Sequence, residues 1–364
     1  MTFKNILITG TGSYVPERVV KNEDFAVNQF FDVEGVAFAE PHAEISEKFR
    51  AITGIAERRY AADDQVCSDL ATLAAQEAIK DANIDAETLD HIIVAHNFGD
   101  VPVGTVQTDM LPSIASKVKN KLEISNPKCI AYDVVFGCPG WIQGTIQARS
   151  YMQSGLAKRC LVIGAETLSR VIDKNDRDSM IYSDGAGATV MEISESDQPY
   201  GMLSTSMATY SNKEAYYLYR GPGYQKGSSP EISYMKMLGR KIYEFSLTHV
   251  PDAMQECLDK SGHTIDEVKK IFIHQANEKM DFEIVKRFYR LYKIRQAPEG
   301  IMPMSISKLG NSSVATIPTL YDRILKGTCL EKHDLHQGDL LLFASVGAGM
   351  NINCLAYRYQ GGKQ

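Results

Sequence analysis

The sequence predicts a mixed α/β fold in which helices cover buried sheets. Short apolar runs, which are typical of buried strands, alternate along the chain with amphipathic stretches of helical period. The chain has 364 residues, 44% of them hydrophobic, which is enough for one large domain or two fused halves. The predicted strands span residues 5–9, 91–95, 129–135, 159–164, 188–193, 270–273 and 340–344.

Helices are expected between these strands. Residues 68–82 and 277–292 carry apolar side chains at helical spacing, and a further helix is expected from Trp141 to a stop at Gly155. Residues 210–230 interrupt this alternation, with tyrosines among Gly, Ser and Pro. We interpret that segment as a long surface excursion between the two halves.

Composition excludes several functional classes. No apolar run approaches the ~20 residues that cross a bilayer, so no membrane insertion is expected. The chain starts directly in a predicted strand, without the pattern of a signal peptide. None of the seven cysteines forms a C-x-x-C pair, which argues against a zinc site or a disulfide framework and favours a reducing cytoplasm. The net charge of −6 gives no reason to expect a nucleic acid partner.

Cys138 is the most informative residue, because it stands between a predicted strand and a predicted helix. Pro139 follows it, and proline is favoured at the first position of a helix. A cysteine there lies at the positive end of the helix dipole, beside unpaired backbone N–H groups. We therefore expect a lowered thiol pKa and a nucleophilic thiolate.

Two other segments place polar residues where a strand ends. His274 follows the strand at 270–273, and Asn311 follows Gly310 at the start of a run of small residues. The carboxyl ends of strands are the usual site-building positions of α/β folds. A thiolate, a histidine and an amide donor form a coherent set for acyl transfer, although each residue taken alone also has a structural explanation.

A series of short motifs resembles the β-ketoacyl-(acyl carrier protein) synthase III family, the initiating condensing enzymes of type II fatty-acid synthesis in the thiolase-like superfamily. The resemblance implies a thiolase-like five-layered αβαβα sandwich of two similar halves, which we place at residues 1–200 and 201–364, and a homodimer. The motifs lie at residues 10–16, 53–59, 136–140, 183–188, 274–277, 310–313 and 347–349.

The resemblance also implies a role for each polar residue. Cys138 would take an acyl group from a coenzyme A thioester as a covalent acyl-enzyme. His274 and Asn311 would donate hydrogen bonds to the enolate formed when malonyl-carrier protein loses CO2. The backbone N–H groups of Cys138 and Ala348 would hold the oxyanion. No metal or other cofactor is implied beyond the coenzyme A thioester and the phosphopantetheinyl carrier protein.

Substrate-binding residues are expected at two places. Residues 46–48 lack the tryptophan with which relatives stack the adenine of coenzyme A, which leaves Arg170 as the candidate partner for the adenine or its phosphates. Acyl carrier proteins present an acidic helix, so a local basic patch is needed on a protein of net negative charge. The predicted helix after His274 offers one, formed by Lys279, Lys286, Arg290 and Lys293.

Three alternatives stay open at this point. A related acyltransferase or head-to-head condensing enzyme of secondary metabolism would keep Cys, His and Asn but use other substrates. A cysteine hydrolase also uses these residues in this order, yet the signature around its nucleophile is absent. A protein that only binds acyl chains is the least favoured, because all three polar residues are retained.

Overall fold

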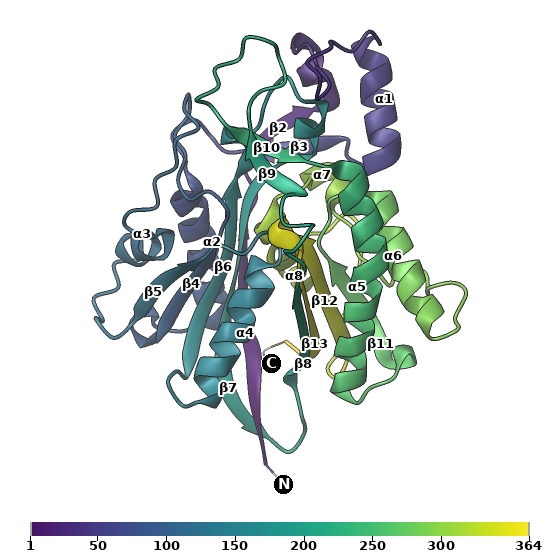
Figure 1. Ribbon diagram of the computed structural model, residues 1–364. Coiled ribbons are helices and arrows are strands. Elements are labelled where there is room, and N and C mark those ends of the chain that lie inside the picture. Colours follow the sequence, from purple (N-terminus) through teal and green to yellow (C-terminus); the bar gives the residue numbers. More distant parts are fainter. Residues whose placement is uncertain (1, 363–364) are drawn as a thin grey trace.

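The computed structural model describes residues 2–362, and it confirms the thiolase-like fold class as a stack of five layers (Figure 1). Two sheets are separated by a middle layer of helices, and each sheet carries further helices on its outer face. The predicted division at residue 200 falls between β7 (Asp184–Ser196) and β8 (Gly201–Thr209), and we keep it as a proposal.

The sheet of the first half has the strand order β5-β4-β6-β7-β1. β4 is parallel to its neighbours β5 and β6, while β7 is antiparallel to β6 and β1. Because β5 is the last strand of this sheet, one of its edges is unpaired within the described chain. The bounds are β1 Phe3–Tyr14, β4 His91–Ala95, β5 Ile130–Val134, β6 Arg159–Thr167 and β7 Asp184–Ser196.

The sheet of the second half has the order β11-β12-β13-β8, with β11 (Val268–Ile273) and β12 (Leu340–Gly347) parallel. β13 (Asn351–Arg358) runs antiparallel to β12 and β8. A short parallel contact between Ile6 of β1 and Gly201 of β8 links the two sheets. Every predicted strand overlaps an observed one, whereas β8 and β13 were not predicted.

Helices form the other three layers. On the outer faces, α2 (Cys67–Ala82) and α3 (Ile114–Lys121) cover the first sheet, and α5 (Gly239–Ser261) and α6 (Glu278–Leu291) cover the second. Between the sheets lie α4 (Gly140–Gln153) and α8 (Thr316–Leu325). No described helix is long and apolar enough to cross a membrane.

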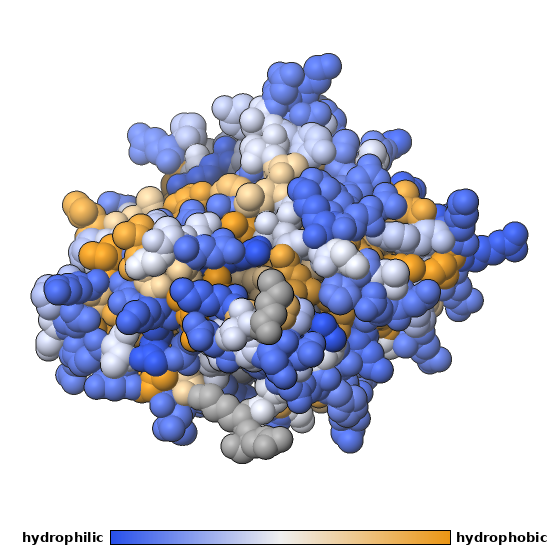
Figure 2. Space-filling view, turned by 90° about the horizontal axis from the view of Figure 1, so that it is seen from below, coloured by the Kyte–Doolittle hydropathy of each residue, from blue (hydrophilic) through white to orange (hydrophobic). Residues whose placement is uncertain are grey.

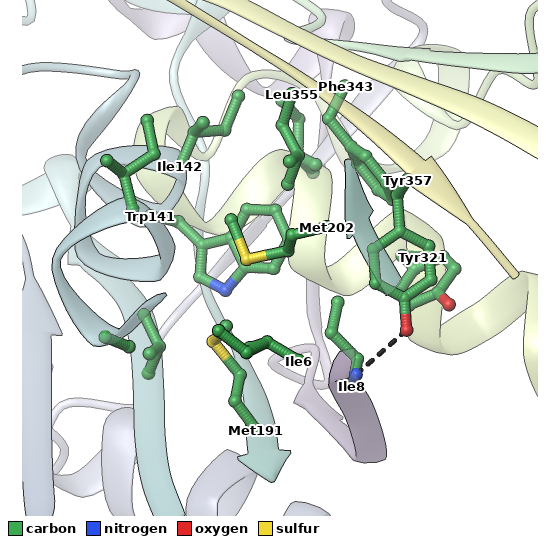
Figure 3. Packing of buried hydrophobic residues seen from close by; sticks show 14 of the residues in the cluster. Ile6, Ile8, Trp141, Ile142, Met191, Met202, Tyr321, Phe343, Leu355 and Tyr357 are labelled. Atoms are coloured by element: carbon green, nitrogen blue, oxygen red, sulfur yellow. Dashed lines mark hydrogen bonds between the residues drawn. The ribbon is translucent and has the colours of Figure 1, made fainter. Parts of the chain in front are cut away.

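The middle layer is held by an apolar core that both sheets share (Figure 3). Trp141 of α4 is its largest side chain and packs on Phe343 of β12, with ring centroids 5.8 Å apart. The hydroxyl of Tyr357 accepts a hydrogen bond from the backbone N–H of Ile8 at 2.9 Å, which ties β13 to β1. This packing fixes α4, and therefore the loop that carries Cys138 before it.

A cap covers the end of the sheets at which β4, β5, β11 and β12 finish (Figure 1). It includes α1 (His42–Thr53), α7 (Ile306–Leu309) and two small sheets, β2 (Arg18–Lys21) with β3 (Glu57–Tyr60) and β9 (Leu218–Gly221) with β10 (Tyr234–Met237). Short 3-10 turns complete the chain at Asn22–Val27, Ala86–Thr88, Leu168–Arg170, Arg177–Ile181, Ile265–Glu267, Ser313–Ala315 and Ala348–Met350.

The prediction that residues 210–230 form a surface excursion is wrong in one respect. The segment enters a β-hairpin whose two strands face inward, and Leu218, Tyr219 and Arg220 line the large cavity described below. The hairpin is anchored by Lys236, which is buried and forms ion pairs with Asp173 (2.6 Å) and Asp176 (3.1 Å). The composition of the segment carried no sign of this buried anchor.

Candidate active site

A cavity of about 820 Å³ lies between the cap and the ends of the strands. Its volume falls in the range of small-molecule sites, ~300–1,000 Å³. Cys138, His274 and Asn311, which come from three distant segments, all line it. The remaining wall is largely apolar and includes Phe49, Leu168, Ile181, Met235, Met237 and Ile242.

Cys138 sits in the turn between β5 and α4, as the sequence predicts. Pro139 precedes the first residue of α4, with a φ of −71°. The expected lowering of the thiol pKa is wrong: burial raises the pKa of Cys138 to about 12, because it removes water from around the charged thiolate, and Glu166 adds to the rise. A hydrogen bond from the Ser313 hydroxyl, with 3.3 Å between Oγ and Sγ, opposes this rise.

Two glycines bring the backbone of the nucleophile turn against the turn after β12. Gly137 has a φ of +69°, and a side chain there would meet the Ala348 nitrogen at 2.7 Å. A side chain at Gly347 would meet the Cys138 nitrogen at 2.4 Å. The backbone N–H groups of Cys138 and Ala348 are therefore neighbours, the arrangement that an oxyanion hole needs.

His274 follows β11 directly, and its backbone N–H donates to the Ala344 carbonyl at 2.9 Å. The next residue, Gln275, fixes the turn: its amide donates to Pro303 and accepts from the Ser305 N–H, both at 2.9 Å. Burial lowers the pKa of His274 to about 4, so the imidazole is neutral near pH 7 and can act as a hydrogen-bond donor.

Asn311 is buried where α7 ends, and backbone hydrogen bonds to Ile181 and from Ser183 hold it. Its side-chain oxygen accepts from the Ser313 N–H at 2.8 Å. Because the oxygen is used in this way, the amide nitrogen is left to donate toward the cavity.

Ser313 is a site residue that the sequence reasoning missed. It lies in the recognised motif at 310–313, but only its hydroxyl contact with Cys138 shows that it touches the nucleophile. Its φ of +52° is unusual for a residue other than glycine. Asn97 donates to the same hydroxyl at 3.0 Å and also to the carboxyl of Glu166.

Comparisons with known proteins match this geometry to one family. The sequence profile of 3-oxoacyl-[acyl-carrier-protein] synthase III matches residues 132–211, and its C-terminal profile matches residues 258–359. A β-ketoacyl-[acyl-carrier-protein] synthase III of Paracoccus denitrificans is 31% identical over 98% of this chain and 100% of its own. The chain belongs to this family. The resemblance inferred from the motifs is thus confirmed.

Other members agree. A synthase III of Staphylococcus haemolyticus is 32% identical over 98% of this chain and 99% of its own. The crystal structure of the Thermus thermophilus synthase III superposes with a TM-score of 0.80 at 29% identity, covering 98% of this chain and all of that one. The protein is therefore an acyltransferase of the β-ketoacyl-acyl-carrier-protein synthase III type, and the cysteine hydrolase alternative is set aside.

The predicted substrate-binding residues lie in different surroundings. Arg170 does not line the cavity; its guanidinium donates to backbone carbonyls, with 2.8 Å to Ala62. Lys279, Lys286 and Arg290 are exposed on α6, but the helix ends at Leu291, so Lys293 lies beyond it. Lys286 is also paired with Glu283 at 3.0 Å.

Four other cations reach the cavity wall and were not predicted as ligands. They come from α1, the turn before β7, the β9–β10 hairpin and the start of α5, and they are Lys48, Arg177, Arg220 and Arg240. Within residues 2–362, no group of three His, Cys, Asp or Glu side chains is placed to hold a metal ion.

Proposed function

We propose that this protein condenses an acyl primer held on Cys138 with malonyl-carrier protein, in a decarboxylating Claisen reaction that starts a fatty-acid or related chain. The observation that carries this proposal is the meeting of two donor sets in one cavity. The N–H groups of Cys138 and Ala348 flank the nucleophile, while His274 and Asn311 approach from the other half.

In the first half-reaction, the Cys138 sulfur attacks the carbonyl carbon of an acyl-coenzyme A. The two backbone N–H groups hold the oxyanion of the tetrahedral intermediate. The bond to the coenzyme A sulfur then breaks, and the leaving thiolate takes up the proton that Cys138 has lost. The primer remains as a thioester on Cys138.

In the second half-reaction, malonyl-carrier protein loses CO2. The electron pair of the broken C–C bond stays on the remaining carbon and is shared with the thioester oxygen as an enolate. Asn311 would donate to the enolate oxygen, together with His274 carrying its proton on Nε2. The enolate carbon attacks the acyl-enzyme, and the bond to Cys138 breaks to return the free thiolate. The chemistry needs no metal or other cofactor.

The carrier protein would dock on α6, where Lys279, Lys286 and Arg290 are exposed beside the turn that holds His274. Such a patch attracts an acidic helix over a distance set by salt screening.

All seven cysteines are free thiols, which supports our placement of the protein in the reducing cytoplasm.

We propose a homodimer formed through the free edge of β5. An edge strand presents unpaired backbone groups and can pair with a second copy. Ile130, which begins β5, and Val135, which directly follows it, are 51% and 63% exposed, and Leu111 in the nearby loop is 89% exposed. Seen from below, several hydrophobic patches lie on the left, the side of β5 in Figure 1 (Figure 2).

The test is to incubate the pure protein with an acyl-coenzyme A and malonyl-carrier protein and to measure both CO2 and a β-ketoacyl-carrier product. We expect both to appear in equal amounts. Release of free fatty acid without CO2 would overturn the proposal in favour of hydrolysis. A product made from two acyl-coenzyme A molecules, with malonyl-carrier protein unused, would show a head-to-head condensing enzyme.

A further inference from the structure

A chain of polar side chains runs from the Cys138 sulfur into the first sheet. Ser313 contacts the sulfur, Asn97 contacts Ser313, and Glu166 of β6 contacts Asn97. Glu166 is 1% exposed and Ser313 is 4% exposed. Burying a carboxyl this deeply beside the partners of the nucleophile costs free energy, so its presence there calls for an explanation.

The Asn97 amide sets the direction of the hydrogen bonds next to the sulfur. One amide N–H of Asn97 is given to the Glu166 carboxyl and the other to the Ser313 oxygen. The Ser313 oxygen is then occupied as an acceptor, and its own proton can go either to the sulfur at 3.3 Å or to the Glu166 carboxyl, which the hydroxyl also contacts. A hydrogen bond to the charged form of a group stabilises that form.

We propose that Glu166 is a positioning residue that, through Asn97, directs the Ser313 hydroxyl onto the Cys138 sulfur and so stabilises the nucleophilic thiolate. The inference rests on the role of Cys138 in the proposed function. Ser313 touches the reacting atom, whereas Glu166 does not and acts on it through Asn97 and through the Ser313 hydroxyl. The left-handed backbone of Ser313, with its φ of +52°, is the local strain that this placement costs.

The charge on Glu166 decides how well the arrangement works. Burial raises the pKa of Glu166 to about 8, so the group is mostly neutral at pH 7 and places no negative charge beside the thiolate. Above that pH the carboxylate would repel the thiolate and compete for the Ser313 proton. The other titratable groups facing Glu166 are Asp184 of β7 and Cys67 of α2.

The test follows alkylation of Cys138 by iodoacetamide between pH 6 and 9.5, with the modified peptide measured by mass spectrometry. In the unchanged protein, the rise of the rate with pH should flatten near pH 8 as Glu166 ionises. Glu166→Gln keeps an acceptor for Asn97 but cannot ionise, so its rate should keep rising. Asp184→Asn is the matched carboxyl-to-amide variant: it removes a neighbouring charge that helps to raise the Glu166 pKa, so its profile should still flatten, at a lower pH.

A second variant tests the donor itself. Ser313→Gly removes the hydroxyl and tolerates the positive φ, so the fold should be kept. We expect alkylation at pH 7 to fall about three- to tenfold, since loss of one hydrogen bond to a charged group is partly offset by the higher nucleophilicity of a more basic thiolate. An unchanged rate in Ser313→Gly, or flattening retained in Glu166→Gln, would overturn the proposal. The assay contains no thioester, so its failure is distinct from failure of the condensation assay.

Discussion

The side-chain oxygen of Asn311 accepts a hydrogen bond from the backbone N–H of Ser313 at 2.8 Å. This contact within one turn assigns two tasks to neighbouring residues. It turns the Asn311 amide nitrogen toward the cavity, and it holds Ser313, whose hydroxyl lies 3.3 Å from the Cys138 sulfur. The turn at 310–313 thus joins the proposed enolate donor to the proposed nucleophile.

Replacing Asn311 or His274 with alanine should cut decarboxylation of malonyl-carrier protein by ~100-fold or more, the usual cost of one well-placed oxyanion donor. Acylation of Cys138 should survive better, because it depends on backbone N–H groups. Release of CO2 and the mass of the acyl-enzyme measure the two steps separately.

Asn311→Asp is the sharper variant. A carboxylate can still accept the Ser313 N–H, so the turn should be kept, but it has no amide proton to donate. We expect the same loss of decarboxylation as with alanine. Normal decarboxylation by Asn311→Asp would contradict the donor role.

Cys138→Ala should abolish the acyl adduct that an acyl-coenzyme A leaves on the protein, measured by intact mass. Iodoacetamide should also reach Cys138 before Cys67, Cys129, Cys160, Cys257 and Cys354, because these five are buried whereas Cys138, like Cys329, is half-buried. With burial raising the thiol pKa, this selectivity comes from access to the cavity rather than from an acidic thiol. Acyl label on Cys160 or Cys129 would contradict the assignment.

The positions of the candidate catalytic residues in the fold could be predicted because they follow local rules. Cys138 and His274 both follow predicted strands, and these apolar strands are visible in the sequence. The expected burial is wrong for β5, an edge strand that is mostly half-buried or exposed, whereas β11 is largely buried. The second half was harder to predict. β8 has serines and β13 has asparagines at buried positions, so neither shows the apolar run that marks β12.

The long-range contacts could not be predicted. Nothing in the local sequence around Lys236 shows that two aspartates some 60 residues earlier will neutralise it. In the same way, Glu166 is an ordinary acidic residue until the fold brings Asn97 and Ser313 beside it. The prediction of a lowered pKa for the Cys138 thiol was wrong for this reason, since burial by distant segments outweighs the effect of the local helix dipole.

Lys236→Ala should destabilise the protein by about 3–5 kcal/mol, because it leaves the buried carboxylates of Asp173 and Asp176 without their cation. The midpoint and slope of urea unfolding measure this. The β9–β10 hairpin should also loosen from the cavity wall and raise the KM for acyl-coenzyme A. Lys226→Ala, in the exposed part of the same hairpin, is the control and should change stability by less than about 0.5 kcal/mol.

Acid should destabilise the protein partly through His274. Its pKa is about 4 when folded and near 6.5 in an exposed chain, so the unfolded state binds more protons between these values. The contribution of His274 to the free energy of unfolding is on the order of 3 kcal/mol in total. It is intact above pH 6.5 and is lost as the pH falls toward 4. His274→Gln should lose less stability than the unchanged protein between pH 7 and 4.5 in urea unfolding. The exposed His336→Gln should follow the unchanged protein, and equal losses in all three would contradict this account.

Carrier docking on α6 predicts a defect that depends on both substrate and salt. Reversing the charge of Lys279 and Lys286 together should raise the KM for malonyl-carrier protein, and the defect should shrink as salt rises, because the attraction is screened. Acylation from a small primer thioester should barely change.

Lys80→Glu, exposed on α2 in the opposite outer layer, is the matched control and should leave the reaction with either substrate unaffected. Since Glu283 already pairs with Lys286, Lys279→Glu alone should account for more than half of the effect. Equal loss with carrier and small primer would mean that the substitutions damage the cavity, and α6 would then not be the docking surface.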